Sequence, residues 1–164
     1  MGQSKQFIFT NLDIDGSLSY LLLKWVTGQE IPYKCSSIFN IEKDFSDWYR
    51  ANGEKYERIY ILGIDVSECM NVINKDNVVV FAHKLPVKEL SNAKIVTDEN
   101  ASTSMLIYKK FAEKVNLTES QKLLIVIADD IKKHTFDLPY SRELDMLYRA
   151  STGDRLMKFC IDFK

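Results

Sequence analysis

The chain has 164 residues, of which 46% are hydrophobic and 27% charged. That length fits one domain with a core large enough to fold without disulfides or a structural metal, and the composition excludes a disordered protein. The 22 Lys and Arg residues nearly balance the 23 Asp and Glu residues, which excludes the general attraction for polyanions of a dedicated duplex-DNA binder. We therefore expect a single domain over residues 1–164, in which any nucleic-acid contact is local.

Short β-rich runs alternate with longer segments of helical period, which predicts a parallel sheet with crossover helices. The first unit is a strand at residues 7–10, a polar turn through Gly16, and a helix that ends before Gly28. Thr118-Glu119-Ser120-Gln121 has the pattern of a capping box. Further strands are expected at residues 33–37, 59–64, 78–81 and 93–96, and helices at 42–50, 68–73, 102–115, 117–128 and 141–150. The prediction is a three-layer α/β fold with about five parallel strands.

The three cysteines, Cys35, Cys69 and Cys160, are far apart and form no Cys-x-x-Cys pair. This spacing indicates neither a disulfide framework nor a zinc site, and it is typical of a reducing cytoplasm. The N-terminus lacks a long apolar run behind a basic start, and no later run approaches the length of a membrane helix. We expect a cytoplasmic protein with no membrane partner.

Asp13 and Asp15 lie between the first predicted strand and its helix, where open parallel sheets place their ligand sites. In extended chain the side chains of residues i and i+2 point the same way, so each carboxylate is placed to hold one ion of a metal pair. Gly16 then allows a tight turn. The alternative is that the two aspartates only cap the following helix.

Asp65 follows the apolar strand 59–64 and is therefore expected at the same edge of the sheet, where a carboxylate can bridge two metals. The alternative is a cap for the helix near Glu68. His83 follows the strand 78–81 and precedes Lys84; imidazole suits a divalent ion, and a lysine suits a phosphate oxygen. The alternative for His83 is a surface loop.

Asp129 and Asp130 follow the apolar run 123–128. Acidic residues at the C-terminus of a helix oppose its dipole and gain nothing for stability, so the pair indicates a nearby cation.

The order of these groups, Asp-x-Asp-Gly, Asp, His and Asp-Asp, each after an apolar run, resembles the DHH phosphoesterase superfamily. The segments FTNLDIDGSLSYLLLKW and IYILGIDVSE are similar to its first two motifs, and NVVVFAHKLP stands where the family has Asp-His-His. NASTSMLIYKKF resembles the helix start that follows, and IADDIKKHTF resembles the segment with the last metal-binding Asp, placed at Asp129 with Asp130 as the alternative. The likeness covers about residues 6 to 135 and is nearest to the short-oligonucleotide nucleases.

The chain departs from the family at its imidazole ligands. Where the first motif begins with a metal-binding His, this chain has Asn11, or Leu12 in a register one place nearer the acids, and a neutral amide oxygen is a poor ligand for a transition ion. Two alignments with Asp-His-His are possible. In the first, Ala82-His83-Lys84, His83 remains a metal ligand and Lys84 takes the phosphate-binding role. In the second, Phe81-Ala82-His83, Ala82 stands at the position of the metal-binding His, so that ligand is lost. Nothing after residue 150 resembles the second domain of the family, which clamps the substrate, so the chain is either a fragment or works without the clamp.

The resemblance implies a phosphoesterase that uses one or two Mn²⁺ or Mg²⁺ ions to hydrolyse a short oligonucleotide, a cyclic dinucleotide or a similar small phosphate ester. The expected metal ligands are Asn11, Asp13, Asp15, Asp65, His83, Asp129 and Asp130, with Lys84 and His83 in catalysis. The alternative is a catalytically impaired DHH-like domain that binds a nucleotide, a short single-stranded nucleic acid or a protein. A third hypothesis is recruitment of a partner protein through Lys132, Lys133 and His134, a run that more often forms a solvated helix end.

Overall fold

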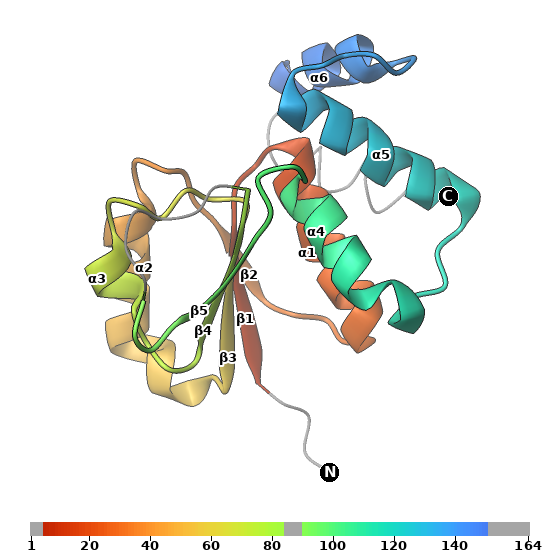
Figure 1. The fold of residues 1–164 in the computed structure, drawn as a ribbon. Helices are drawn as coiled ribbons and strands as arrows, with labels where there is room; N and C mark the ends of the chain where they lie inside the picture. Colours follow the sequence, from red (N-terminus) through yellow and green to blue (C-terminus); the bar gives the residue numbers. More distant parts are fainter. Residues whose placement is uncertain (1–4, 84–89, 151–164) are drawn as a thin grey trace.

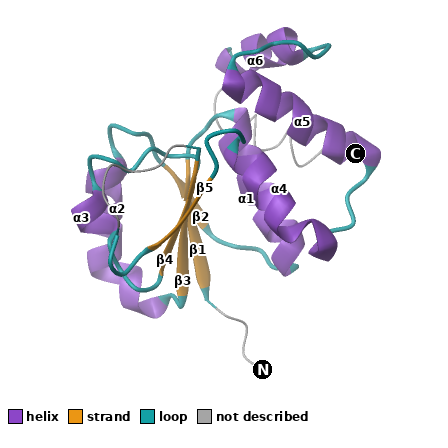
Figure 2. Ribbon diagram, viewed as in Figure 1, coloured by secondary structure: helices purple, strands orange, loops and turns teal. Residues whose placement is uncertain are grey.

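The computed structural model describes residues 5–83 and 90–150. Its centre is a five-stranded sheet in the order β2-β1-β3-β4-β5, in which every pair of neighbours is parallel (Figures 1 and 2). The α/β fold class and the five parallel strands predicted from the sequence are therefore confirmed. The strands are β1 (Gln6–Thr10), β2 (Tyr33–Cys35), β3 (Arg58–Leu62), β4 (Val78–Ala82) and β5 (Lys94–Thr97).

Helices cover both faces of the sheet, as expected for parallel strands joined by crossovers (Figure 1). One face carries α1 (Ile14–Thr27) and α4 (Thr103–Phe111), with α5 (Glu119–Lys133) packed on these two helices and α6 (Ser141–Arg149) on α5. The other face carries α2 (Ile41–Asn52) and α3 (Met70–Ile73). Two 3₁₀ turns, η1 (Gly53–Lys55) and η2 (Ala112–Lys114), follow α2 and α4.

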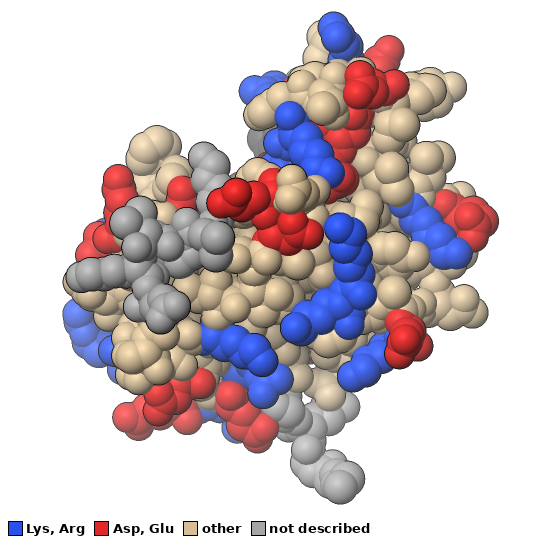
Figure 3. All heavy atoms as spheres, in the orientation of Figure 1, with Lys and Arg blue, Asp and Glu red and all other residues tan. Residues whose placement is uncertain are grey.

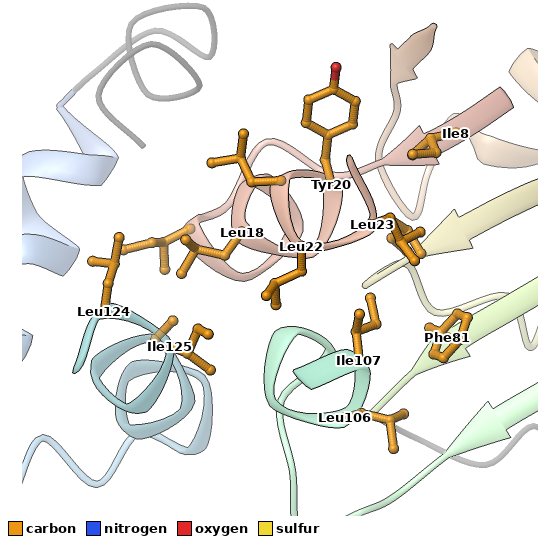
Figure 4. Packing of buried hydrophobic residues seen from close by; sticks show 14 of the residues in the cluster. Ile8, Leu18, Tyr20, Leu22, Leu23, Phe81, Leu106, Ile107, Leu124 and Ile125 are labelled. Carbon is orange, nitrogen blue, oxygen red and sulfur yellow. The ribbon is translucent and has the colours of Figure 1, made fainter. Parts of the chain in front are cut away.

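Alternate residues of the strands pack into two separate hydrophobic cores, because successive side chains of a strand point to opposite faces of the sheet. In β1, Phe7 and Phe9 pack under α2, whereas Ile8 packs under α1. The larger core joins α1, α4 and α5; Figure 4 shows Leu22 of α1 pointing toward α4 and α5, and Ile107 of α4 lying near Phe81 of the sheet. Burial on both faces explains why the strands read as nearly continuous apolar runs.

The two helices predicted within residues 102–128 end at other positions in the structure. The first, α4, ends at Phe111 and is followed by η2, whereas the prediction runs to residue 115. The capping box at Thr118 and Gln121 is confirmed, but α5 continues past Ala128 to Lys133 and ends at His134, whose φ is 58°. The prediction ended this helix too early because two adjacent acids looked like a terminus. Their carboxylates instead accept hydrogen bonds from groups outside the helix, so the helix backbone continues through them.

Within residues 5–83 and 90–150, no helix has both the length and the apolar character needed to cross a membrane.

Candidate functional site

A cavity of about 800 Å³ opens at the carboxyl edge of the sheet. β1 leads into α1 on one face and β3 leads into α3 on the other, so the chain leaves two neighbouring strands in opposite directions. Such a switch point is where open α/β sheets hold their ligands. The cavity is lined by residues that follow β1, β3, β4 and β5, together with the ends of α5 and α6.

Asp13 lies at the entrance to α1 and accepts three hydrogen bonds. Its Oδ1 accepts the backbone N–H of Gly16 at 2.7 Å, which caps the helix. Its Oδ2 accepts the Asn11 amide N–H at 2.6 Å and the Lys132 ammonium at 3.0 Å. Asn11 therefore presents a donor to Asp13, while its own Oδ1 is buried and has no hydrogen-bond partner within residues 5–83 and 90–150. The capping role considered for Asp13 is present in the structure.

Asp15 is 1% exposed and lies against the N-terminus of α4. Its two oxygens accept the backbone N–H groups of Thr103 at 3.0 Å and Ser104 at 2.7 Å. Burial, and then the nearby Asp13 carboxylate, raises the pKa of Asp15, against the lowering effect of Lys132 and Ser104. The side chain thus ties α1 to α4 rather than capping its own helix.

Asp129 reaches the same end of α4 from α5. Its Oδ1 accepts the backbone N–H of Ser102 at 2.6 Å, and its Oδ2 pairs with the Lys133 ammonium at 2.5 Å. Asp15 and Asp129, which are far apart in sequence, therefore meet at one helix terminus. This convergence is the one expected from the motif order.

Asp130 points the other way and fixes the turn between α5 and α6. It accepts the hydroxyl groups of Thr135 and Ser141 and the backbone N–H groups of Asp137 and Leu138. Burial by itself would raise the pKa of Asp130, but these four donors hold it well below its usual range. Asp129 is therefore the member of the pair that joins Asp13 and Asp15 in an acidic cluster near the N-terminus of α4.

Asp65 and His83 line the cavity from the ends of β3 and β4, as predicted. Asp65 Oδ1 accepts the backbone N–H of Ser67 at 3.0 Å and its hydroxyl at 2.6 Å. The His83 Nδ1 lies 3.0 Å from the Ala101 carbonyl oxygen, which can only accept, so Nδ1 is the donor of this hydrogen bond. Lys84 lies outside the described residues.

The described lining of the cavity holds more carboxylates than cations. The carboxylates are Asp13, Asp15, Asp65, Glu99 and Asp145. The cations are Lys132, Lys133 and Arg149, which pair with Asp13, Asp129 and Asp145 at 3.0, 2.5 and 2.8 Å. Figure 3 shows the same mixture of acidic and basic groups on the visible face near α6.

The sequence prediction missed the residues that neutralise the acidic cluster. The sequence pattern of Lys132 and Lys133 indicates a partner-recruiting basic patch or a solvated helix end, but both ammonium groups turn toward aspartates. The backbone N–H groups of residues 102–104 were also missed, although Ser102 caps α4 by accepting from Met105. The available signal was the acid at position 129 followed four residues later by a lysine, a spacing that pairs on a helix.

The described residues do not fit the metal pair that the resemblance implies. Divalent ions need several acceptor atoms directed at a common point. Within residues 5–83 and 90–150, no three His, Cys, Asp or Glu side chains gather closely enough to hold an ion. Asp13, Asp15 and Asp129 each use both oxygens to accept protein N–H groups.

Neither a protein-family model nor a curated protein matches the sequence. The fold does match solved structures. An uncharacterized protein from Helicobacter pylori G27 has a TM-score of 0.65 at 10% identity, over 98% of this chain and 56% of that one. Exonuclease RecJ bound to manganese has a TM-score of 0.54 at 13% identity, over 87% and 42%. CDC45 from Entamoeba histolytica has a TM-score of 0.51 at 13% identity, over 89% and 34%.

The chain spans little more than half of the first of these structures and less than half of the other two. At such low identity the likeness shows the fold alone. It is a RecJ-like α/β fold, so the DHH-like architecture predicted from the motifs is confirmed.

Proposed function

We propose that this chain, with its DHH-like fold, is a binding module that takes a basic segment of a partner protein into the crevice at the carboxyl edge of its sheet, without metal-dependent hydrolysis. The observation that carries the proposal is the charge balance of the crevice. Each Lys or Arg in its described lining is already paired with an aspartate, and carboxylates are in excess.

This charge balance selects between ligand classes. A phosphate needs ammonium, guanidinium or N–H donors directed at it, and the described lining offers no unpaired Lys or Arg for that purpose. A Lys or Arg side chain from a partner would instead face a lining that is rich in carboxylates, among them Asp13, Asp65 and Glu99. The cavity of about 800 Å³ is large enough to admit such side chains.

A second candidate function is a divalent-metal-dependent phosphoesterase acting on a short oligonucleotide or cyclic dinucleotide. Its support is that Asp13, Asp15, Asp65 and His83 all line one cavity at the switch point. The similarity of fold to a manganese-bound RecJ exonuclease adds to that support. In this case Lys84, next to His83, would contact the phosphate.

Binding and turnover assays on the full chain separate the two candidates. We expect a fluorescent oligoarginine peptide to bind, to be released by salt, and to bind more weakly to Asp65→Asn and Glu99→Gln. The matched control Asp47→Asn changes an exposed acid in α2 that is not in the lining, and it should leave binding unchanged.

Other outcomes of the same assays would support the second candidate or contradict the first. Hydrolysis of a dinucleotide or a chromogenic phosphodiester in the presence of Mn²⁺, lost in Asp65→Asn, would establish the second candidate. Failure of the peptide to bind, or equal binding by wild type and Asp65→Asn, would overturn the first.

A further inference from the structure

Two adjacent apolar residues, Ile38 and Phe39, form the tip of the turn between β2 and α2. The Ser37 carbonyl oxygen accepts the backbone N–H of Asn40 at 3.0 Å, which places Ile38 and Phe39 at the two central positions of the turn. Ile38 is 49% exposed and Phe39 is 92% exposed. The central positions of turns favour Gly, Pro, Asn and Asp, so turn formation does not explain two large apolar side chains there.

Helix α2 does not bury the Phe39 ring. Asn40 is the N-cap of α2, so Phe39 is the residue before the cap and Asp44 is the fourth residue of the helix. A hydrophobic residue before a cap commonly packs on an apolar residue at that fourth position, but here the position holds a carboxylate. Exposing an aromatic ring to water is unfavourable, and an exposed apolar group beside a cavity is typical of a binding surface.

Hydrogen bonds fix the backbone on which these two side chains stand. Asp44 of α2 accepts the Lys34 ammonium at 2.9 Å and the Ser36 hydroxyl at 2.7 Å, so it ties the end of β2 to the helix across the turn. The Ser36 backbone N–H also donates to the Thr10 carbonyl oxygen of β1 at 2.9 Å. An apolar group that is already held in place loses little conformational freedom when a partner binds, which favours affinity.

The turn lies at the rim of the acidic crevice. Ile38 belongs to the lining of the crevice together with Asp65. Leu12, which is 43% exposed, leaves the neighbouring strand β1 at the same edge of the sheet, and the first turn of α2 adds the acid Glu42. Apolar and acidic groups side by side suit a ligand that has both basic and apolar side chains. A nucleic acid or an anionic membrane would bring phosphate groups against these carboxylates.

We infer that Ile38 and Phe39 are an apolar docking surface that continues the crevice, and that the partner segment carries a large aliphatic residue beside its Lys or Arg residues. The inference rests on the proposed function, because the basic side chains occupy the crevice while the aliphatic side chain covers Phe39. The carboxylates then attract the segment, and Phe39 supplies its sequence preference.

Titration of the full chain with two fluorescent peptides tests the inference. Both peptides contain four arginines, flanked at either end by a Leu-Leu pair in one and by a Ser-Ser pair in the other. Wild type should bind the leucine peptide at least about tenfold more tightly than the serine peptide, because leucine and Phe39 bury each other. Phe39→Ser should lose this preference and bind both peptides with equal affinity, whereas Phe39→Leu should retain most of it.

Two controls accompany the titration. Leu123→Ser removes an exposed apolar residue of α5 that is not in the lining, and it should keep the full preference for the leucine peptide. The melting temperature of Phe39→Ser should stay near that of wild type, because a side chain that is 92% exposed contributes little packing.

The outcomes separate this inference from the proposed function. Asp65→Asn should weaken both peptides alike, since the arginines are common to them. If wild type binds the two peptides equally and Asp65→Asn weakens both, the proposed function stands and this inference is overturned. If wild type binds neither peptide, both are overturned. The inference is also overturned if Phe39→Ser keeps the preference, or if Phe39 promotes binding only to oligothymidylate or to phosphatidylserine vesicles.

Discussion

The Asp15 carboxylate in the first turn of α1 accepts the backbone N–H of Thr103 at 3.0 Å and that of Ser104 at 2.7 Å, so a residue of one helix caps another helix from a distant part of the chain. Asp15→Ala leaves two buried N–H groups without acceptors. We expect it to lower the free energy of unfolding by about 2–4 kcal/mol. Asp15→Asn keeps one acceptor and loses the cost of a buried charge, so it should be milder.

Urea unfolding followed by circular dichroism measures these losses. The exposed Asp47→Ala in α2 is the control, since a surface pair such as Asp47 with Lys43 contributes less than about 1 kcal/mol. An Asp15→Ala protein as stable as Asp47→Ala would show that the α1–α4 connection contributes nothing.

Asp130 gives a second stability prediction, at the turn between α5 and α6. Its carboxylate accepts two hydroxyl groups and two backbone N–H groups, including those of Ser141 and Leu138. We expect Asp130→Asn to cost about 2–3 kcal/mol at neutral pH, because an amide nitrogen replaces one accepting oxygen. Loss of helical signal from α6 before the rest of the chain should accompany it.

The loss of stability caused by Asp130→Asn should be largest near neutral pH and should shrink as the pH falls. The four donors hold the pKa of Asp130 below its usual range, against the raising effect of burial. The stability that this carboxylate contributes is therefore complete above about pH 5 and is lost as the pH falls below the ordinary value of about 3.9. Unfolding measured from pH 6 down to 2 should show wild type and variant converging; a constant difference would contradict the assignment.

The meeting of the candidate site residues at one place could be predicted, because the rule that parallel sheets hold ligands at their carboxyl edge agrees with the positions of the polar residues in the sequence. Each of the strands β1, β3 and β4 is an apolar run followed within three residues by Asp13, Asp65 or His83, and carboxyl ends of parallel strands share one edge. That Asp13, Asp65 and His83 line one cavity could therefore be predicted without any knowledge of side-chain positions.

The partners of the acids were not predictable in the same way. Lys132 meets Asp13 only because α5 extends one turn past Ala128 and lies beside the start of α1, a contact between residues 119 positions apart. Periodicity gives the face of a helix but neither its last residue nor its placement against another helix. The role of Asp130 depends likewise on the path of the chain from Thr135 to Ser141, where no periodic signal exists.

Alanine substitutions at Gly63 and Gly28 test how closely the end of β3 approaches Asn11. Gly63 has φ of 68° and Gly28 has φ of 64°, so alanine is strained by about 1–2 kcal/mol at either position. A Cβ at Gly28 meets nothing within 4 Å, whereas one at Gly63 lies 3.1 Å from Asn11 Oδ1. Gly63→Ala should therefore destabilise by at least about 0.5 kcal/mol more than Gly28→Ala in urea unfolding. Equal losses would show that Asn11 gives way without cost.

The buried thiol of Cys69 should be unreactive and should make stability sensitive to alkali. Burial, and then the charge of Glu42, raises the pKa of Cys69 from 9.0 to about 11. Because the thiolate is the nucleophile, iodoacetamide at about pH 8 should modify Cys69 on the order of 100-fold more slowly in the folded chain than in urea. Mass spectrometry of the Cys69 and Cys35 peptides measures this, with the half-exposed Cys35 as the internal comparison.

The sign of the alkaline effect follows from the raised pKa. Since the folded pKa of Cys69 lies above the ordinary value of 9.0, the stability contributed by the protonated thiol is complete below that value and is lost as the pH rises toward about 11. Wild type should therefore lose stability more steeply than Cys69→Ala over that interval, although the variant starts lower because of the small cavity it creates. Parallel stability curves for the two proteins, or rapid alkylation of Cys69 in the folded chain, would show that the core around Val66 and Cys69 opens readily to solvent.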